Sequence, residues 1–177
     1  MTERRLPMSI IAACSLNRVI GKQGRLPWSL PCDWAFFATT TRHQVLLVGR
    51  KSFEEFGAPV PNRKTIVISR SRFQDPPRCW KDVRVARSID HALEMVASDP
   101  QYAACSRIFV GGGEQIYTEV LARDLVESCV VTRVQQHITG GDAFLPPWTQ
   151  QLPTLAFSRS TRSSIDGTGL SFQVWTK

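Results

Sequence analysis

Residues 26–37 read Leu26-Pro27-Trp28-Ser29-Leu30-Pro31-Cys32-Asp33-Trp34-Ala35-Phe36-Phe37 and set one carboxylate, Asp33, among aromatic and aliphatic side chains. The two prolines rule out a continuous helix through the first half, because proline lacks an N–H and fixes φ. A helix can start near Asp33. Burial among apolar groups raises the pKa of a carboxyl and makes it a candidate proton donor or a partner for a cationic ligand. The same aspartate could instead cap a helix over an aromatic cluster. The segment alone leaves both interpretations open.

The composition predicts one globular domain over residues 1–177. Hydrophobic residues make up 42% and charged residues 21% of the chain, which is ordinary for a globular protein. No apolar run approaches the roughly 20 residues of a membrane span. The cysteines are odd in number and lack CxxC spacing, which favours reduced thiols, a cytoplasmic location and no zinc. The three histidines form no ligand motif, so we expect no metal site.

The net charge of +7 could serve solubility alone or indicate an anionic partner, either nucleic acid or a polyphosphate ligand. The basic residues are dispersed along the chain, without a Lys/Arg-rich run or a basic-aromatic repeat. A small anion held at several separate points fits this dispersion better than a nucleic-acid groove does. We therefore expect a small-molecule ligand, no membrane partner and a monomeric protein.

Strand and helix patterns alternate along the chain and predict an α/β fold. The expected helices follow Ser88, a suitable N-cap, and cover residues 114–121. In the last strand Leu170, Phe172 and Val174 alternate with polar residues and Trp175, so one face should be buried. Short strands between helices imply a mixed, mostly parallel sheet with a C-terminal antiparallel hairpin. The expected strands cover residues 9–14, 45–48, 65–69, 83–86, 108–110, 129–134, 155–159 and 170–175.

Three of these strands end in groups that suit phosphates. The first reads Val110-Gly111-Gly112-Gly113-Glu114-Gln115-Ile116-Tyr117, and glycines before a helix allow a ligand to approach backbone N–H groups. The others read Val48-Gly49-Arg50-Lys51-Ser52 and Ile68-Ser69-Arg70-Ser71-Arg72. In an open α/β sheet, ligands bind beyond the carboxyl ends of strands, so a dinucleotide would span all three. The chain has no GxGxxG, GxSxG, HExxH or P-loop motif.

Taken in order, these motifs resemble those of the dihydrofolate reductase family from about residue 8 to the C-terminus. The matching positions are Ile20-Gly21, Gly24, Leu26-Pro27-Trp28, Leu30-Pro31, Asp33, Phe37, residues 48–52, Pro61, Arg63, residues 68–70, Gly112-Gly113, Ile116-Tyr117, Thr132-Arg133, Gly141-Asp142 and Pro146. The resemblance implies an eight-stranded mixed sheet with about four helices. It also implies NADPH-dependent reduction of 7,8-dihydrofolate to 5,6,7,8-tetrahydrofolate, with a hydride to C6 and a proton to N5. Such an activity supports one-carbon and thymidylate metabolism and makes the protein a target of antifolates.

The resemblance also implies site residues. Asp33 would orient the pterin and promote protonation of N5, Thr132 would hydrogen-bond Asp33, and Trp28 would hold an ordered water. The implied catalytic residues are Asp33, Trp28, Thr132 and Leu26. The implied substrate-binding residues are Ile11, Asp33, Phe37, Phe56, Val60, Thr132 and, for the substrate's α-carboxylate, Arg63. The implied NADPH-binding residues are Ala13, Ile20, Gly49, Arg50, Lys51, Ser52, Ser69, Arg70, Gly111, Gly112, Gly113, Glu114, Gln115, Ile116 and Tyr117. A cis peptide is expected between Gly112 and Gly113, and residues 17–30 would form a loop that closes over the nicotinamide.

Several residues depart from the family pattern, among them Asn62, which replaces the usual glycine or lysine-glycine turn, and Gln115, which follows Glu114. Gly111 stands where a branched apolar residue is usual, which predicts a wider pocket wall or a glycine alignment shifted by one. Glu114 places an acid close to the phosphates, where it would need a neighbouring base. Trp34 is bulky beside the substrate position.

Other functions compete with this interpretation. A pyrimidine reductase of riboflavin synthesis shares the fold but would need a ribosyl-phosphate site and would not need Trp28 with Asp33. A basic module that binds RNA or a protein partner is a different class. A chain that is normally linked to thymidylate synthase is a third possibility, although no second domain appears before Lys177.

Overall fold

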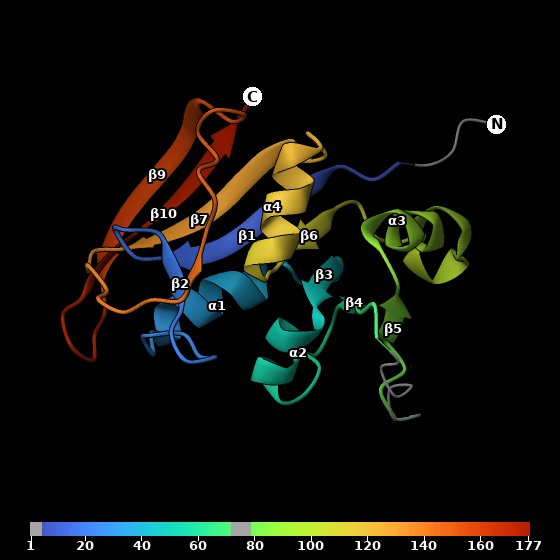
Figure 1. Cartoon of the computed structure of the whole chain (residues 1–177), viewed down its shortest axis with the longest axis horizontal. Coiled ribbons are helices and arrows are strands. Elements are labelled where there is room, and N and C mark those ends of the chain that lie inside the picture. The colour runs from blue at the N-terminus through green and yellow to red at the C-terminus, as the bar shows by residue number, and fades with distance from the viewer. Residues whose placement is uncertain (1–4, 72–78) are drawn as a thin grey trace.

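The computed structural model describes residues 5–71 and 79–177 and is built around one eight-stranded sheet. Figure 1 shows the strands running from β9 at the left to β5 at the right. The six strands from β5 to β7 are parallel, β10 pairs antiparallel with β7, and β9 pairs antiparallel with β10. Across the sheet the strands are β5 (Val83–Ala86), β4 (Lys64–Ile68), β3 (Val45–Gly49), β6 (Ile108–Val110), β1 (Met8–Cys14), β7 (Ser128–Val134), β10 (Gly169–Thr176) and β9 (Thr154–Arg162).

Helices cover both faces of this sheet, and the strand sequences show why. Neighbouring strand residues point to opposite faces, so Ile10 packs in one apolar cluster and Ile11 in another. The Ile11 cluster includes side chains of α1 (Pro31–Thr40) and α2 (Arg50–Phe56). The Ile10 cluster includes side chains of α3 (Ile89–Ser98), α4 (Glu114–Ala122) and the 3-10 turn η1 (Pro100–Tyr102). Central strands buried on both faces explain the continuous apolar runs in the sequence.

The predicted mixed sheet and its C-terminal hairpin are confirmed. All eight predicted strands are present, with ends that differ by a few residues, and Ser88 caps α3 by accepting a hydrogen bond from the His91 N–H at 3.1 Å. None of the helices in the described part of the chain has the length and apolar character needed to cross a bilayer.

Two local features of the fold differ from expectation. The helix α1 begins at Pro31 with Leu30 as its N-cap, so Asp33 lies inside the first turn and the N-cap interpretation is wrong. Proline suits the first helical position because the N–H it lacks has no partner there. A second, two-stranded sheet pairs β2 (Val19–Gly21) with β8 (Ala143–Phe144). Strands this short carry no detectable alternation of side chains.

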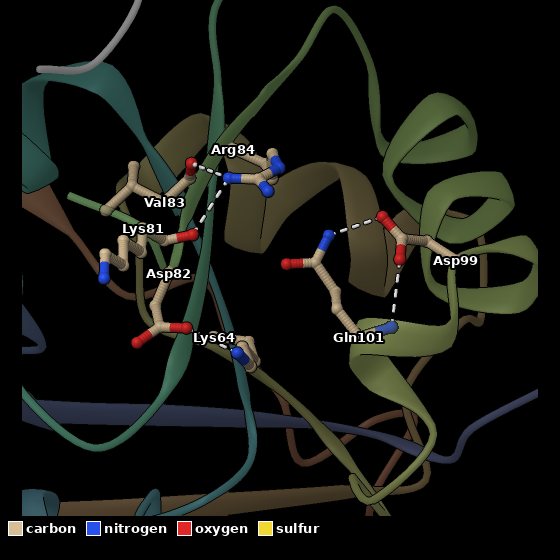
Figure 2. Close-up of polar contacts among 7 residues, drawn as sticks. All are labelled: Lys64, Lys81, Asp82, Val83, Arg84, Asp99 and Gln101. Atoms are coloured by element: carbon tan, nitrogen blue, oxygen red, sulfur yellow. Dashed lines mark hydrogen bonds and ion pairs between the residues drawn. The ribbon is translucent and has the colours of Figure 1, made fainter. Parts of the chain in front are cut away.

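Polar contacts hold the β5 edge of the main sheet (Figure 2). Lys64 at the start of β4 forms an ion pair with Asp82, whose carbonyl also accepts a hydrogen bond from the Thr65 N–H at 2.8 Å. Arg84 donates to the carbonyls of Lys81 and Val83, both at 3.0 Å. Exposed pairs of this kind contribute about 0–1 kcal/mol each, so the edge depends mainly on its buried residues.

Candidate active site

One cavity lies on the α1 side of the sheet, at the carboxyl ends of β1, β6 and β7. Apolar groups form most of its wall, and Asp33 and Thr132 place a carboxyl and a hydroxyl in it. The lining residues are Ile11, Ala12, Ala13, Ile20, Leu26, Asp33, Trp34, Phe36, Phe37, Ser52, Glu55, Phe56, Gly111, Gly112, Gly113, Tyr117 and Thr132. They come from six elements far apart in sequence, and the crossing of α1 over the strand ends brings them together.

Asp33 and Thr132 form the polar centre of this cavity. The first turn of α1 presents Asp33, and β7 presents Thr132, which is buried. Burial raises the pKa of Asp33, and the hydrogen bond from the Thr132 side chain lowers it by less than burial raises it. The pair can therefore hold a proton at a higher pH than a solvated aspartate does, or orient a cationic or amide-like ring.

Aromatic rings from α1 and α2 form the outer wall. The Trp34 ring centroid lies 5.4 Å from that of Phe37 and 6.1 Å from that of Phe56, and Phe37 and Phe56 are also 6.1 Å apart. These spacings are those of rings in contact with one another, so the three rings form one apolar surface against which a flat ligand can pack. Trp34 is 48% exposed, so it stands at the mouth, as its position beside the substrate predicted.

The glycine segment closes the inner end of the cavity. The peptide between Gly112 and Gly113 is cis, as expected from the family resemblance. The Gly49 N–H donates to the Gly112 carbonyl at 2.7 Å, so the starts of α2 and α4 lie side by side. A Cβ on Gly113 would come within 3.2 Å of Ser52 Oγ. The two glycine turns therefore leave backbone accessible next to Ser52.

Side chains of the neighbouring strand β3 fill the space beside Gly111 that a larger residue would occupy. A Cβ on Gly111 would lie 2.9 Å from Leu46 Cδ1 and 3.2 Å from Val48 Cγ1. Leu46 thus fills the volume that a larger side chain at 111 would need. The cis bond follows Gly111 directly, so the glycine alignment is not shifted. The expected widening of the wall is also wrong at this point, because Leu46 occupies that space.

A second group of polar side chains lies beyond the cavity, around the start of α2. Arg50 Nη1 donates to Ser71 Oγ at 2.8 Å, and Ser69 Oγ lies 3.3 Å from the same oxygen. Arg50 also forms a 3.6 Å ion pair with Glu54. These contacts bring together the ends of β3 and β4, two of the three strand ends that carry groups suited to phosphates. The side chains of Lys51 and Arg70 are exposed beside it.

Glu114 has a partner that sequence reasoning missed. Its Oε2 accepts a hydrogen bond from the Phe144 N–H at 3.2 Å, so a backbone amide takes the place of the expected base. Phe144 lies in β8, which pairs with β2. In the same region Asp142 Oδ2 accepts from the Gln23 N–H at 2.8 Å. The start of α4 and residues 19–23 are therefore joined through 142–144.

Arg63 lies outside the cavity wall but is held rigidly. Its Nη1 donates to the Pro61 carbonyl at 2.6 Å, and its Nη2 donates to the Ala38 carbonyl at 2.7 Å. Only 6% of the residue is exposed, and Nε has no acceptor within the described chain. Burial and the charge of Arg42 lower the pKa of Arg63. A bound carboxylate would stabilise this guanidinium.

The structure brings most, but not all, of the predicted residues together. Thirteen of them line the cavity, and Gly49, Arg50 and Ser69 adjoin it through the contacts above. Trp28 packs against Leu30 in a separate apolar cluster, with an indole N–H that has no acceptor among the described residues. Val60 is buried outside the wall, Gln115 is exposed, and Ile116 packs against the α4-side core.

Three contributors were not predicted: Ala12, Phe36 and Glu55. Ser71 belongs to the predicted strand end 68–72, of which Arg72 lies outside the described residues. Glu55 lines the cavity, and burial raises the pKa of its carboxyl. A glutamate on a helix is usually solvated, so the sequence carried no signal for it. Phe36 stacks on Phe172 of β10 with ring centroids 4.3 Å apart, a pairing of residues too distant in sequence to foresee.

Comparisons with known proteins agree with this geometry. A family model described as dihydrofolate reductase matches residues 7–177. The chain is 35% identical to dihydrofolate reductase type 6 of Proteus mirabilis, over 97% of this chain and 99% of that protein. It is 33% identical to the dihydrofolate reductase of Staphylococcus haemolyticus, over 80% of this chain and 77% of that protein.

A solved structure gives the same result for the fold. The dihydrofolate reductase of Enterococcus faecalis, complexed with NADP(H) and RAB-propyl, superposes with a TM-score of 0.81 at 25% identity. The match covers 96% of this chain and 95% of that one.

Proposed function

Because the chain belongs to the dihydrofolate reductase family, a family of oxidoreductases, we propose that it reduces 7,8-dihydrofolate to 5,6,7,8-tetrahydrofolate with NADPH. The reaction adds a hydride to C6 of the pterin and a proton to N5. The observation that carries the proposal is the Asp33–Thr132 pair, a single hydrogen-bonded carboxyl in an otherwise largely apolar cavity.

Asp33 has the properties that the pterin end requires. Its carboxyl faces the cavity from the first turn of α1, and Thr132 fixes its orientation. A carboxyl whose pKa is raised keeps a proton available at a pH where a solvated aspartate has lost it. Ile11, Phe37 and Phe56 supply the apolar surfaces that pack on the flat ring and exclude water. The indole N–H of the half-buried Trp28 is itself buried and has no acceptor among the described residues, so it is suited to an ordered water that relays the proton.

Arg63 is suited to the substrate's α-carboxylate. Two of its nitrogen atoms are held by backbone carbonyls, and none forms an ion pair within the described chain. A buried, preoriented guanidinium without an anionic partner is a costly arrangement that a carboxylate ligand relieves. Val60 supports this end of the site as a buried neighbour rather than as part of the wall.

The residues present also fit NADPH, which supplies the hydride when it is bound. Gly112 and Gly113 leave no side chain between the cavity and the start of α4, whose first N–H groups are free to hold a phosphate. Arg50, Ser69 and Ser71 add a cation and two hydroxyls in mutual contact beside that point. Lys51 and Arg70, both exposed nearby, would add charge for the 2′-phosphate. Ala13 and Ile20 line the cavity where they can flank the nicotinamide.

Leu26 and residues 17–30 would enclose the reacting atoms. Leu26 lines the cavity although half of it is exposed, so it forms a movable edge of the wall. Excluding water there protects the hydride transfer and favours protonation by Asp33.

A spectrophotometric assay of NADPH oxidation tests the proposal. We expect oxidation that depends on dihydrofolate and is abolished by methotrexate. Oxidation with an aminopyrimidine ribosyl-phosphate instead would indicate the pyrimidine reductase function. Salt-sensitive RNA binding without any NADPH turnover would indicate the basic module. Either result would overturn the proposal.

A further inference from the structure

A second cavity lies on the opposite face of the sheet from the candidate active site. Thr132 of β7 faces the first cavity, and the next residue, Arg133, lines the second, because neighbouring strand residues point to opposite faces. The second cavity has a volume of about 470 Å³. Its walls also include Arg18, Trp148, Gln173 and Trp175. The proposed reduction uses none of these side chains.

Two guanidinium groups face this cavity without an anionic partner. Arg133 Nη2 donates to the Leu16 carbonyl at 3.2 Å, and Arg18 Nη1 donates to the Leu145 carbonyl at 2.7 Å. Across residues 5–71 and 79–177, neither group forms an ion pair with a carboxylate. Both side chains line the same cavity, and Arg133 also donates a hydrogen bond to the Cys14 thiol. Each guanidinium carries five N–H donors, and most of these remain available.

Indole rings form the wall beside these cations. The Arg133 guanidinium carbon lies 5.5 Å from the centre of the Trp148 ring, a cation–π geometry that fixes its position. Trp175 meets Trp148 edge to face, with ring centres 6.2 Å apart. The Trp175 N–H is already satisfied, since it donates to Gln173 Oε1 at 3.0 Å. The Trp175 ring therefore offers apolar and π surface rather than a hydrogen bond, whereas the buried Trp148 N–H has no acceptor among the described residues.

We propose that this cavity binds a small aromatic carboxylate. The carboxylate would pair with the guanidinium groups of Arg133 and Arg18, whose planar fork matches two carboxylate oxygens. The flat ring would pack on the indole wall formed by Trp148 and Trp175. A binding anion would also relieve the repulsion between two neighbouring cations that share a cleft.

Benzoate is the probe that tests this site. It is added to the complex of the protein with NADPH and methotrexate, in which the first cavity is already filled. Indole N–H signals in ¹H–¹⁵N spectra, assigned with Trp148→Phe, report where it binds. We expect saturable shifts of the Trp148 and Trp175 signals. Benzamide keeps the ring without the charge and should bind about tenfold more weakly, the loss expected for a charge-assisted hydrogen bond. Cyclohexanecarboxylate keeps the charge without the flat ring and should also bind more weakly than benzoate.

Two arginine-to-glutamine variants distinguish benzoate binding at this cavity from a general effect of surface charge. Arg133→Gln should lower the benzoate affinity by about tenfold, whereas Arg159→Gln on the exposed strand β9 should leave it unchanged. Equal affinity in wild type and Arg133→Gln, or shifts at Trp34 without shifts at Trp148 and Trp175, would overturn the proposal. Failure of the NADPH–methotrexate complex to form would count against the proposed function instead. The same indole signals then report the second cavity in the free protein.

Discussion

The two ends of the candidate active site differ in how far water reaches their charged groups. Asp33 lies in an apolar cavity, where burial raises its pKa and Thr132 alone is identified as its side-chain partner. Arg50 lies at the other end, 40% exposed and already paired with Glu54 and Ser71. Charge interactions are strong where water is excluded and weak where it is not. The enclosed end should therefore control the chemical step, and the open end should control affinity.

The largest effect is expected for Asp33→Asn. Removing the acid that pairs with Thr132 should lower turnover at neutral pH by roughly 10²–10⁴-fold, the usual contribution of general acid catalysis. NADPH affinity, measured by fluorescence titration, should stay nearly unchanged. Because burial raises the pKa of Asp33, wild-type turnover should fall as the pH rises through that pKa. The variant should regain part of its turnover at low pH, where solvent supplies the proton.

Asp124→Asn is the matched control for this charge change. Asp124 is exposed, pairs with Lys177 at 3.0 Å and has φ of 50°, a conformation that asparagine tolerates. Its turnover should equal that of the wild type. Undiminished turnover of Asp33→Asn at neutral pH would remove Asp33 from the proposed mechanism.

Arg63→Gln should have the next largest effect, on KM rather than on kcat. Losing a charge-assisted hydrogen bond of about 1.5–3 kcal/mol predicts a KM for dihydrofolate that is raised by about 10–150-fold. A reduced pterin without the glutamate tail should show the same KM with both enzymes. An equal rise for both substrates would mean that Arg63 acts only by holding the Pro61 and Ala38 carbonyls.

A third test concerns packing at the enclosed end. Gly111→Val should lower the free energy of unfolding by about 1–3 kcal/mol, because its side chain meets Leu46 and Val48. Combining it with Leu46→Val should restore part of that loss, with a coupling energy of about 1 kcal/mol in urea unfolding. Strictly additive losses would show that Leu46 does not compensate for the glycine.

The sequence predicted the parts of this protein that depend on local patterns. Short apolar runs in the sequence predict the buried strands. Asp33 stands out as a candidate functional residue because it is a single acid among Trp28, Trp34 and Phe37. What it did not predict depends on contacts between distant segments. Leu46 compensates for Gly111 across 65 positions, and Glu114 meets Phe144 across 30. Neither partner is unusual in its own sequence context.

The same limit explains the second cavity. The polar side of the last strand looked like a solvent face, because Ser171, Gln173 and Trp175 alternate with apolar residues. In the fold, Gln173 and Trp175 form a cavity wall with Arg133 and Trp148. An alternating pattern tells which residues share a face, but not what lies across from that face.

The smallest effect is expected for Arg50→Gln, at the open end. An exposed ion contact contributes about 0.2–1 kcal/mol, so the Kd for NADPH should rise by only about two- to fivefold, with kcat unchanged. The rise should shrink as salt is added, since screening weakens exposed charges. NADH, which lacks the 2′-phosphate assigned to Lys51 and Arg70, should lose about as much affinity as NADPH does. Glu54→Gln is the control, because it frees Arg50 from its 3.6 Å ion pair and should tighten NADPH slightly. A loss of kcat in Arg50→Gln that matches the one in Asp33→Asn would contradict the division into an enclosed catalytic end and an open binding end.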